Sequence, residues 1–254
     1  MSGTTVVVGG AQGIGAELAR RLAREPWTER LVVADLLLDG CEELARELNG
    51  EGCEVSAVGV DVTDGDQVAE LVAATADAER VAIAAGIFAP AAALEVEREQ
   101  FARILAVNLT GVFFVAQAYA RSMGECGSGA IVGVASIAAR MPRMRQVAYC
   151  ASKAGMRHAL RVLGMEVAPS GVRVNTVSPG ATDTPMMRTL AGDHPSVDDL
   201  AIGSLEAMRP RIPHGRVART ADVANVVSFL LAPDSGHIHL QDVVVDGGEL
   251  LGMA

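Results

Sequence analysis

Residues 4–15 read Thr-Thr-Val-Val-Val-Gly-Gly-Ala-Gln-Gly-Ile-Gly, so a glycine-rich turn directly follows a short β-branched run. Apolar residues at helical spacing continue through residues 16–24. Strand, turn and helix in this order are the context in which glycines bind a dinucleotide, because they let the backbone approach a pyrophosphate at the helix N-terminus. The spacing G-x-x-G-x-G of Gly10, Gly13 and Gly15 differs from the usual GxGxxG, so the prediction depends on this context. The expected loop consists of Gly10, Gln12, Gly13, Ile14 and Gly15.

The rest of the chain continues to alternate strands and helices. Further strands are predicted at residues 31–34, 54–60, 81–84, 130–134, 172–177 and 242–245. Helices are predicted between them, at about residues 40–49, 64–75, 99–123, 147–167 and 221–231. Seven strands alternating with helices, without repeats or a linker, predict an α/β fold with one parallel, doubly wound sheet of the Rossmann type. We expect residues 1–254 to form a single dinucleotide-binding and catalytic domain, with a substrate lid at about residues 181–219, where no clean period is present.

Composition excludes several classes of protein. The formal net charge is −10 and basic residues are scattered, which argues against nucleic acid as a partner. We find neither a signal-peptide pattern nor an apolar run of the roughly 18 residues that a membrane span needs. The four cysteines show no CxxC spacing and no paired histidines, so they are interpreted as reduced thiols. These features predict a cytoplasmic enzyme for a small molecule, without a metal.

Acidic and glycine residues at strand ends indicate further cofactor contacts. Asp35 ends the second strand, twenty residues after Gly15, where a carboxylate accepts both hydroxyls of the adenosine ribose and repels a 2′-phosphate. This favours NAD over NADP, with a capping or turn aspartate as the alternative. Asp61, followed by Val62, is expected at the adenine amino group, although Asp at a strand end is also an ordinary turn residue. Gly86 would let the backbone pass close to a ribose.

Three residues in the middle of the chain are suited to moving a proton. Tyr149 and Lys153 are an i, i+4 pair on a predicted helix and therefore share a face. A free phenol has a pKa of roughly 10, and a nearby ammonium is expected to lower it. Ser136, at the end of a buried strand, can donate to an alcohol or carbonyl oxygen beside Tyr149. Asn108 lies within an apolar helical run, which is unfavourable unless its amide has a function. For Tyr149 and Lys153 the alternative is an ordinary pair on a helix surface. For Asn108 the alternative is a structural hydrogen bond.

In these motifs the chain resembles the short-chain dehydrogenase/reductase family over essentially its whole length. The resemblance implies NAD-dependent catalysis by Asn108, Ser136, Tyr149 and Lys153, with the last two also at the cofactor. It further implies a homotetramer, with the long helices forming one interface and the last strand another. It also implies cofactor contacts from Pro179, Gly180, Thr182 and Thr184, with Thr184 at the nicotinamide carboxamide. Two positions depart from the family. Gly9 stands where Thr is usual, and Ile83-Ala84-Ala85-Gly86 replaces Asn-Asn-Ala-Gly, so side-chain bracing of the loops is expected to be lost.

A narrower resemblance concerns the substrate. Residues 178–184, 187–190, 142–143 and 237–248 resemble a subfamily that oxidises a ring hydroxyl of dihydroaromatic carboxylic acids to give phenolic acids. The implied reaction converts 2,3-dihydro-2,3-dihydroxybenzoate to 2,3-dihydroxybenzoate, in siderophore or antibiotic biosynthesis. One alternative substrate is 2,3-dihydro-3-hydroxyanthranilate, which has an amine at C2. Another alternative is a non-catalytic NAD-binding regulator, against which the four intact catalytic positions speak.

Either acid requires an anion site near Tyr149. Arg140, Arg143 and Arg145 lie between Ser136 and Tyr149, and an arginine can bind a carboxylate through two parallel hydrogen bonds. Arg143 is our choice because it belongs to the subfamily resemblance, and Arg188 in the lid is second. Met187 is placed beside them in the substrate site. A solvated loop arginine is the alternative for each.

Overall fold

The computed structural model of the chain describes residues 3–50, 52–191 and 196–251. Its strands are β1 (Gly3–Val8), β2 (Thr28–Asp35), β3 (Glu54–Gly59), β4 (Ala78–Ile83), β5 (Gly129–Val134), β6 (Val172–Pro179) and β7 (Asp242–Val245). They form one parallel sheet in the order β3-β2-β1-β4-β5-β6-β7, which confirms the predicted fold. The order reverses between β1 and β4, and in open α/β sheets such a reversal leaves a crevice beyond the carboxyl ends of the strands.

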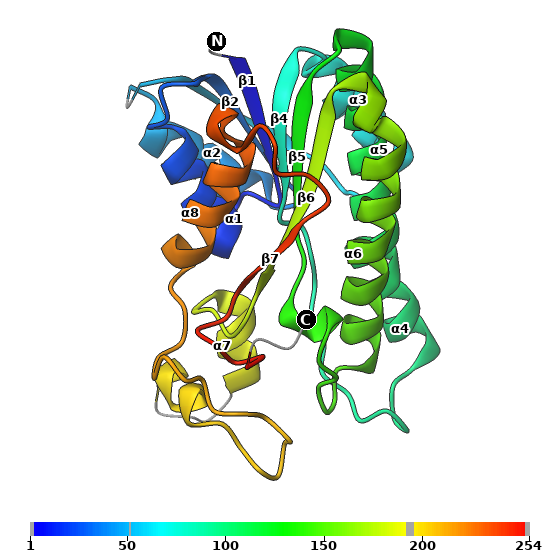
Figure 1. The fold of residues 1–254 in the computed structure, drawn as a ribbon, viewed down its shortest axis with the longest axis vertical. Coiled ribbons are helices and arrows are strands. Elements are labelled where there is room, and N and C mark those ends of the chain that lie inside the picture. The colour runs from blue at the N-terminus through cyan, green and yellow to red at the C-terminus, as the bar shows by residue number, and fades with distance from the viewer. Residues whose placement is uncertain (1–2, 51, 192–195, 252–254) are drawn as a thin grey trace.

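Helices cover both faces of the sheet (Figure 1). One face carries α1 (Gly13–Leu22), α2 (Leu38–Leu48) and α8 (Thr220–Leu231), and the other carries α3 (Gly65–Ala74), α5 (Val112–Cys126) and α6 (Val147–Val167). Strand β1 contributes to both cores, because Val6 and Val8 belong to one hydrophobic cluster and Val7 to the other. Coverage of both faces explains why central strands contain continuous apolar runs, such as residues 6–8 in β1 and 130–134 in β5.

The predicted helix at residues 99–123 is not regular. Instead α4 (Arg98–Leu105) passes through a π-helical segment, Ala106–Gly111, into α5. A π turn often marks a functional site, and this one contains the buried Asn108. The whole run Arg98–Cys126 is long and apolar enough to cross a membrane by length and composition, contrary to our expectation. However, Val112, Val115 and other α5 residues lie in the main hydrophobic cluster, as expected for a core helix.

The predicted lid is partly helical. It contains α7 (Pro185–Ala191) and a 3-10 segment, Val197–Ile202, whereas residues 192–195 lie outside the described residues. A small hydrophobic cluster of its own holds the lid together, formed by Ala181, Leu200, Ala201, Ile212 and Val217. The lid follows β6 and lies beyond the carboxyl end of the sheet (Figure 1). Its position therefore borders the crevice that the strand order creates.

Candidate active site

The glycine loop connects β1 to α1 through close backbone contacts. Gly9 and Gly13 have positive φ values of 85° and 57°, which favour glycine. A Cβ on Gly15 would lie 1.9 Å from the Gly9 carbonyl oxygen, so only glycine fits that position. The loop leads into the N-terminus of α1, where Gln12 is the exposed residue before the first turn and Ile14 is partly buried. A backbone bent in this way leaves room for a pyrophosphate at the helix N-terminus.

Backbone packing joins the loop at Gly9 to the loop after β4. A Cβ on Gly9 would lie 2.3 Å from the Ala85 nitrogen. The amides of Ala84 and Ala85 donate to the Val8 carbonyl at 2.7 and 3.1 Å, and the Gly9 amide donates to Ala34 at 2.7 Å. The residues that follow both strands are small, and therefore the backbones of the two loops contact each other directly. No longer side chain is needed to connect them.

Asp35 faces the glycine loop from the end of β2. Its Oδ2 accepts from the Ala11 amide at 3.1 Å and its Oδ1 accepts from the Leu37 amide at 3.0 Å. Asp61 lies at the end of β3, where its Oδ1 accepts from the amide and the hydroxyl of Thr63. Both carboxylates thus lie at the carboxyl edge of the sheet, as predicted, and both also organise their own turns. Val62 is buried, and its carbonyl would meet a Cβ on Gly111 at 2.7 Å.

Asn108, Gly86 and Lys153 meet at the centre of the site. The Asn108 Oδ1 accepts from the Ile87 amide at 2.7 Å, and its Nδ2 donates to the Ile87 carbonyl at 2.9 Å and to the Ser152 hydroxyl at 3.2 Å. A Cβ on Gly86 would lie 3.4 Å from both the Asn108 Oδ1 and the Lys153 Nζ. The side chain of Asn108 therefore fixes the loop after β4 against α6. Ser152 had no signal in the sequence.

Lys153 is the only lysine in the sequence, and it is 4% exposed. Its Nζ donates to the Val134 carbonyl at 2.8 Å and lies 5.9 Å from the centre of the Tyr149 ring. No carboxylate of the described residues forms an ion pair with it. Burial lowers the pKa of Lys153 to about 8. At pH 7 most of the amine is therefore still protonated and supplies a positive charge.

The side chains of Tyr149 and Ser136 are hydrogen-bonded to each other. The Ser136 hydroxyl also accepts from the Ala138 amide at 3.1 Å, and the Phe88 ring packs edge-on against Tyr149 at 5.2 Å between centroids. The predicted lowering of the Tyr149 pKa was wrong for the protein alone. Burial raises the pKa of Tyr149 to about 12, and the hydrogen bond from Ser136 offsets only part of this effect. The ammonium of Lys153, 5.9 Å from the centre of the Tyr149 ring, does not reverse it.

The segment after β6 returns to the glycine loop. Pro179 ends the strand, and the Gly180 amide donates to the Val245 carbonyl at 2.9 Å. Thr182 is buried and its hydroxyl donates to the Gly180 carbonyl at 3.1 Å. The Thr184 Cγ2 lies 3.5 Å from where a Cβ on Gly13 would be. These contacts bring the start of the lid beside the predicted dinucleotide loop.

The predicted substrate residues lie in three different surroundings. Arg143 is nine-tenths buried, and its Nη2 donates to Glu249 Oε1 at 2.7 Å. Arg188 is exposed and pairs with Asp183 at 2.9 Å, whereas Met187 packs against the hydrophobic cluster of the lid. Of the other two loop arginines, Arg140 pairs with Asp242 at 2.8 Å and Arg145 is exposed. Glu249 was not among the residues predicted from the sequence.

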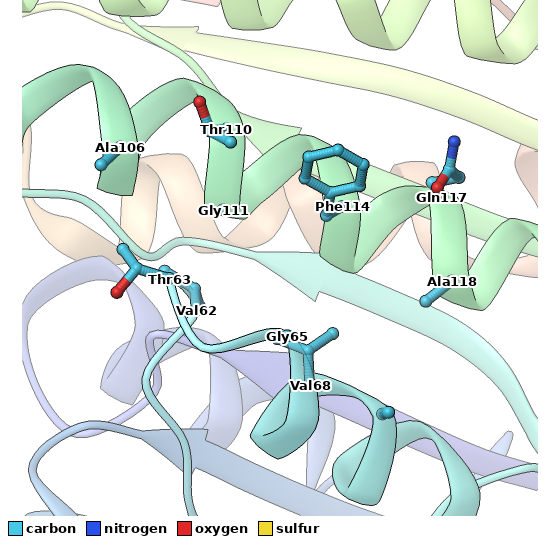
Figure 2. Close-up of a pocket in the computed structure, with 11 residues that line it drawn as sticks. Val62, Thr63, Gly65, Val68, Ala106, Thr110, Gly111, Phe114, Gln117 and Ala118 are labelled. Carbon is cyan, nitrogen blue, oxygen red and sulfur yellow. The ribbon is translucent and has the colours of Figure 1, made fainter.

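A separate cavity of about 290 Å³ lies between the N-terminal end of α3 and α5 (Figure 2). Val62 and Thr63 line one side, and Phe114 and Gln117 of α5 line the other. Ser136, Tyr149 and Lys153 do not line it, so it is distinct from the catalytic cluster. Elsewhere, the described residues include no group of three or more His, Cys, Asp or Glu side chains that could hold a metal ion.

The glycine loop, Asp35 and Gly86 together fit a nicotinamide dinucleotide. The loop offers a side-chain-free cradle at the N-terminus of α1, and a Cβ on Gly15 would obstruct it. Asp35 would meet the adenosine ribose, and Lys153 lies against Gly86, where the other ribose would pass. These residues lie at the carboxyl ends of β1, β2 and β4, and open α/β sheets bind their ligands at this edge.

Comparison with known proteins agrees with this geometry. The family described as Enoyl-(Acyl carrier protein) reductase matches residues 9–249. The 2,3-dihydro-2,3-dihydroxybenzoate dehydrogenase of Bacillus subtilis (strain 168) is 34% identical over 97% of this chain and 95% of its own length. The Escherichia coli (strain K12) protein of that name is 41% identical over 76% of this chain and 79% of its own length. A Beutenbergia cavernae structure, assigned as an NAD(P)-dependent gluconate 5-dehydrogenase and solved with NADP at low occupancy, is 32% identical, with a TM-score of 0.88 over 98% of this chain and 97% of that one.

Proposed function

The chain belongs to the short-chain dehydrogenase/reductase family of oxidoreductases acting on CH–OH groups, and from this premise we propose that it oxidises a ring hydroxyl of a dihydroaromatic carboxylic acid. The substrate we propose is 2,3-dihydro-2,3-dihydroxybenzoate and the product is 2,3-dihydroxybenzoate. The observation that carries the reaction class is the hydrogen bond between Ser136 and Tyr149 beside the buried Lys153. Similarity to the two dehydrogenases of that name supports the choice of acid.

In the proposed mechanism Tyr149 removes the proton of the ring hydroxyl and Ser136 holds the oxygen of that hydroxyl. NAD⁺, when bound along the glycine loop, supplies the hydride acceptor and an additional positive charge. The phenol needs this charge, because the protein alone leaves the pKa of Tyr149 at about 12. Lys153 contributes a second positive charge from the same helix face. The ketone formed from a cyclohexadienol tautomerises to a phenol, which makes the oxidation nearly irreversible.

Asn108 has a positioning role in this proposal. Its three hydrogen bonds hold the Ile87 peptide and Ser152, so the loop that carries Gly86 stays against Lys153. The π-helical turn aims this amide at the loop, and its side chain is fully buried. We therefore place Asn108 in support of the proton-transfer residues, as the family resemblance implies.

Of the two nicotinamide dinucleotides, NAD and NADP, we propose that the protein uses NAD. Asp35 would accept two charge-assisted hydrogen bonds from a ribose diol, and these are roughly twice as strong as neutral ones. The 2′-phosphate of NADP would bring negative charge against this carboxylate. The turn that follows, Leu36-Leu37-Leu38, offers no arginine to receive it. This supports a preference for NAD of at least about tenfold.

We also propose that the protein is cytoplasmic and that it forms a tetramer. Phe114 on α5 is 52% exposed, and Val162 and Met165 are exposed on the adjoining helix α6. Exposed apolar residues on neighbouring helices support an interface between copies of the chain. Light scattering would test the tetramer, and a monomer at micromolar concentration would argue against it.

The direct test of the function is turnover of the two dihydroaromatic acids with NAD⁺. We expect oxidation of 2,3-dihydro-2,3-dihydroxybenzoate, detected by formation of NADH and of the fluorescent product. Tyr149→Phe should lose at least about 100-fold in kcat, because it lacks the acid–base group. Faster turnover of 2,3-dihydro-3-hydroxyanthranilate would replace the proposed substrate with the C2 amine. Binding of NAD without oxidation of any ring alcohol would favour the non-catalytic regulator.

A further inference from the structure

A buried cluster of three charged side chains lies where the lid meets the loop before α6. The Glu249 side chain is fully buried, and its Oε1 is 2.7 Å from Arg143 Nη2 and 3.4 Å from Arg209 Nε. The exposed fractions of the two arginine side chains are 10% and 15%. Its other oxygen, Oε2, lies 3.4 Å from the Ala181 amide. One carboxylate thus serves two guanidinium groups.

The cluster carries an excess of one positive charge. Among the described residues, Glu249 is the only acidic side chain that forms an ion pair with either arginine. The nearby Asp246 is occupied, because its oxygens accept from the amides of Gly248 and Leu250 at 2.8 and 2.7 Å. Arg143 Nη1 is buried and has no hydrogen-bond partner among the described residues. A buried charged donor without a partner is costly, so this cluster lacks one anion.

Three segments around the proposed substrate space contribute to the cluster. Arg143 precedes Tyr149 by six residues, in the loop that links the Ser136 turn to α6. Glu249 Oε2 lies 3.1 Å from where a Cβ on Gly180 would be, directly after β6. Arg209 belongs to the lid, where its amide and carbonyl pair with Ser204. An anion bound here would therefore contact both the lid and the loop that leads to Tyr149.

We propose that Arg143 and Arg209 together bind the carboxylate of the substrate, held by Glu249, and that Arg209 is a specificity-determining residue. This inference rests on the proposed function, because it names the group of that substrate which the site recognises. The incoming carboxylate makes the cluster neutral and gives Arg143 Nη1 its acceptor. Glu249 keeps the two guanidinium groups on one carboxylate before substrate arrives, so less ordering is needed on binding.

The test compares two substrates in three variants. The substrates are the dihydroxy acid and the same cyclohexadiene diol without its carboxylate. Arg209→Met should lower kcat/KM for the acid by at least about tenfold and leave the neutral diol within about threefold, because only the acid loses a charged partner. Arg209→Lys keeps the charge without the planar fork and should lose an intermediate amount on the acid. Arg211→Met removes an exposed arginine of the same lid and should change neither substrate.

Equal losses on both substrates, or an Arg209→Met enzyme within about threefold of wild type on the acid, would overturn the inference. Thermal unfolding and NAD affinity, measured for each variant, identify a folding defect. If Arg209→Met is defective, the loss of Arg209→Lys on the acid relative to the neutral diol decides whether Arg209 binds the carboxylate. Binding of 2,3-dihydroxybenzoate and of catechol, measured by calorimetry with NAD⁺ present, separates this inference from the proposed function. A protein that does not turn over the acid, but binds the dihydroxybenzoate more tightly than catechol and loses that difference in Arg209→Met, would refute the function and support the site. Equal binding of both compounds by wild type would refute the site.

Discussion

Replacement of the single lysine by methionine should make the protein without cofactor more stable at neutral pH, although it removes activity. Lys153 is buried, its pKa is lowered from 10.5 to about 8, and its Nζ has one hydrogen bond, to the Val134 carbonyl. A lowering of this size corresponds to about 3 kcal/mol by which the fold disfavours the charged amine at pH 7. Lys153→Met removes that cost and leaves the Val134 carbonyl unpaired, which costs about 1–2 kcal/mol. A net gain of about 1–2 kcal/mol is expected.

The dependence on pH distinguishes this explanation from a general packing effect. Between pH 8 and 10.5 the unfolded wild-type chain binds more protons at Lys153 than the folded chain does, so wild-type stability from this group rises with pH. The advantage of Lys153→Met should therefore shrink by about 2–3 kcal/mol between pH 7 and pH 10, and change sign. Urea unfolding of both proteins at four pH values measures this difference.

Arg161→Met on the same helix is the matched control. Arg161 is exposed and donates to the Leu240 carbonyl at 3.2 Å, and a guanidinium does not titrate in this range. Its stability difference from wild type should be independent of pH. Parallel curves for Lys153→Met and wild type from pH 7 to pH 10 would refute the reasoning, because they would mean that the buried amine has an ordinary pKa.

Three further changes test the cofactor cradle and its support. Gly15→Ala places a Cβ 1.9 Å from the Gly9 carbonyl and should weaken NADH binding at least about tenfold by fluorescence titration, whereas Gly65→Ala, with nothing within 4 Å, should not. Asp35→Asn keeps an acceptor for the Ala11 amide but removes the charge, so the ratio of kcat/KM for NAD to that for NADP should fall by about tenfold. An unchanged ratio would mean that residues other than Asp35 distinguish NAD from NADP. Asn108→Ala leaves both polar groups of Ile87 without a partner and should lower the free energy of unfolding by about 2–4 kcal/mol, against a small loss for Gln100→Ala, whose bond to Ala89 is 3.4 Å long.

Local patterns in the sequence were sufficient for the sheet and for the elements that carry most of the candidate site residues. The turn at Gly9–Gly15, the aspartate after β2 and the pair Tyr149 and Lys153 each lie within a few residues of the element that positions them. The π turn left no trace, because one extra residue in an apolar helix changes neither composition nor the neighbouring periods. Two signals in the lid were missed: Pro185 as the first residue of α7, and the capping box of Ser196 with Asp199.

Properties that depend on distant residues could not be predicted in this way. Arg143, Arg209 and Glu249 are separated by at least 40 residues in the chain, and no local period connects them. The direction of the Tyr149 pKa shift depends on how far the phenol is buried and on where the Lys153 amine points. Sequence spacing placed these two residues on one face of a helix, but the balance of desolvation and charge required the surrounding packing.

The burial of Lys153 also determines how the protein reacts with reagents that attack primary amines. Apart from the amino terminus of the chain, Lys153 is the only primary amine present, and arginine supplies every other permanent positive charge. Acylating dyes, aldehyde fixatives and amine-coupling supports would therefore leave the outer surface almost unmodified. Because Lys153 is 4% exposed, covalent labelling at this position must wait for the site to open. The rate of that labelling would report the opening of the pocket, without any engineered probe.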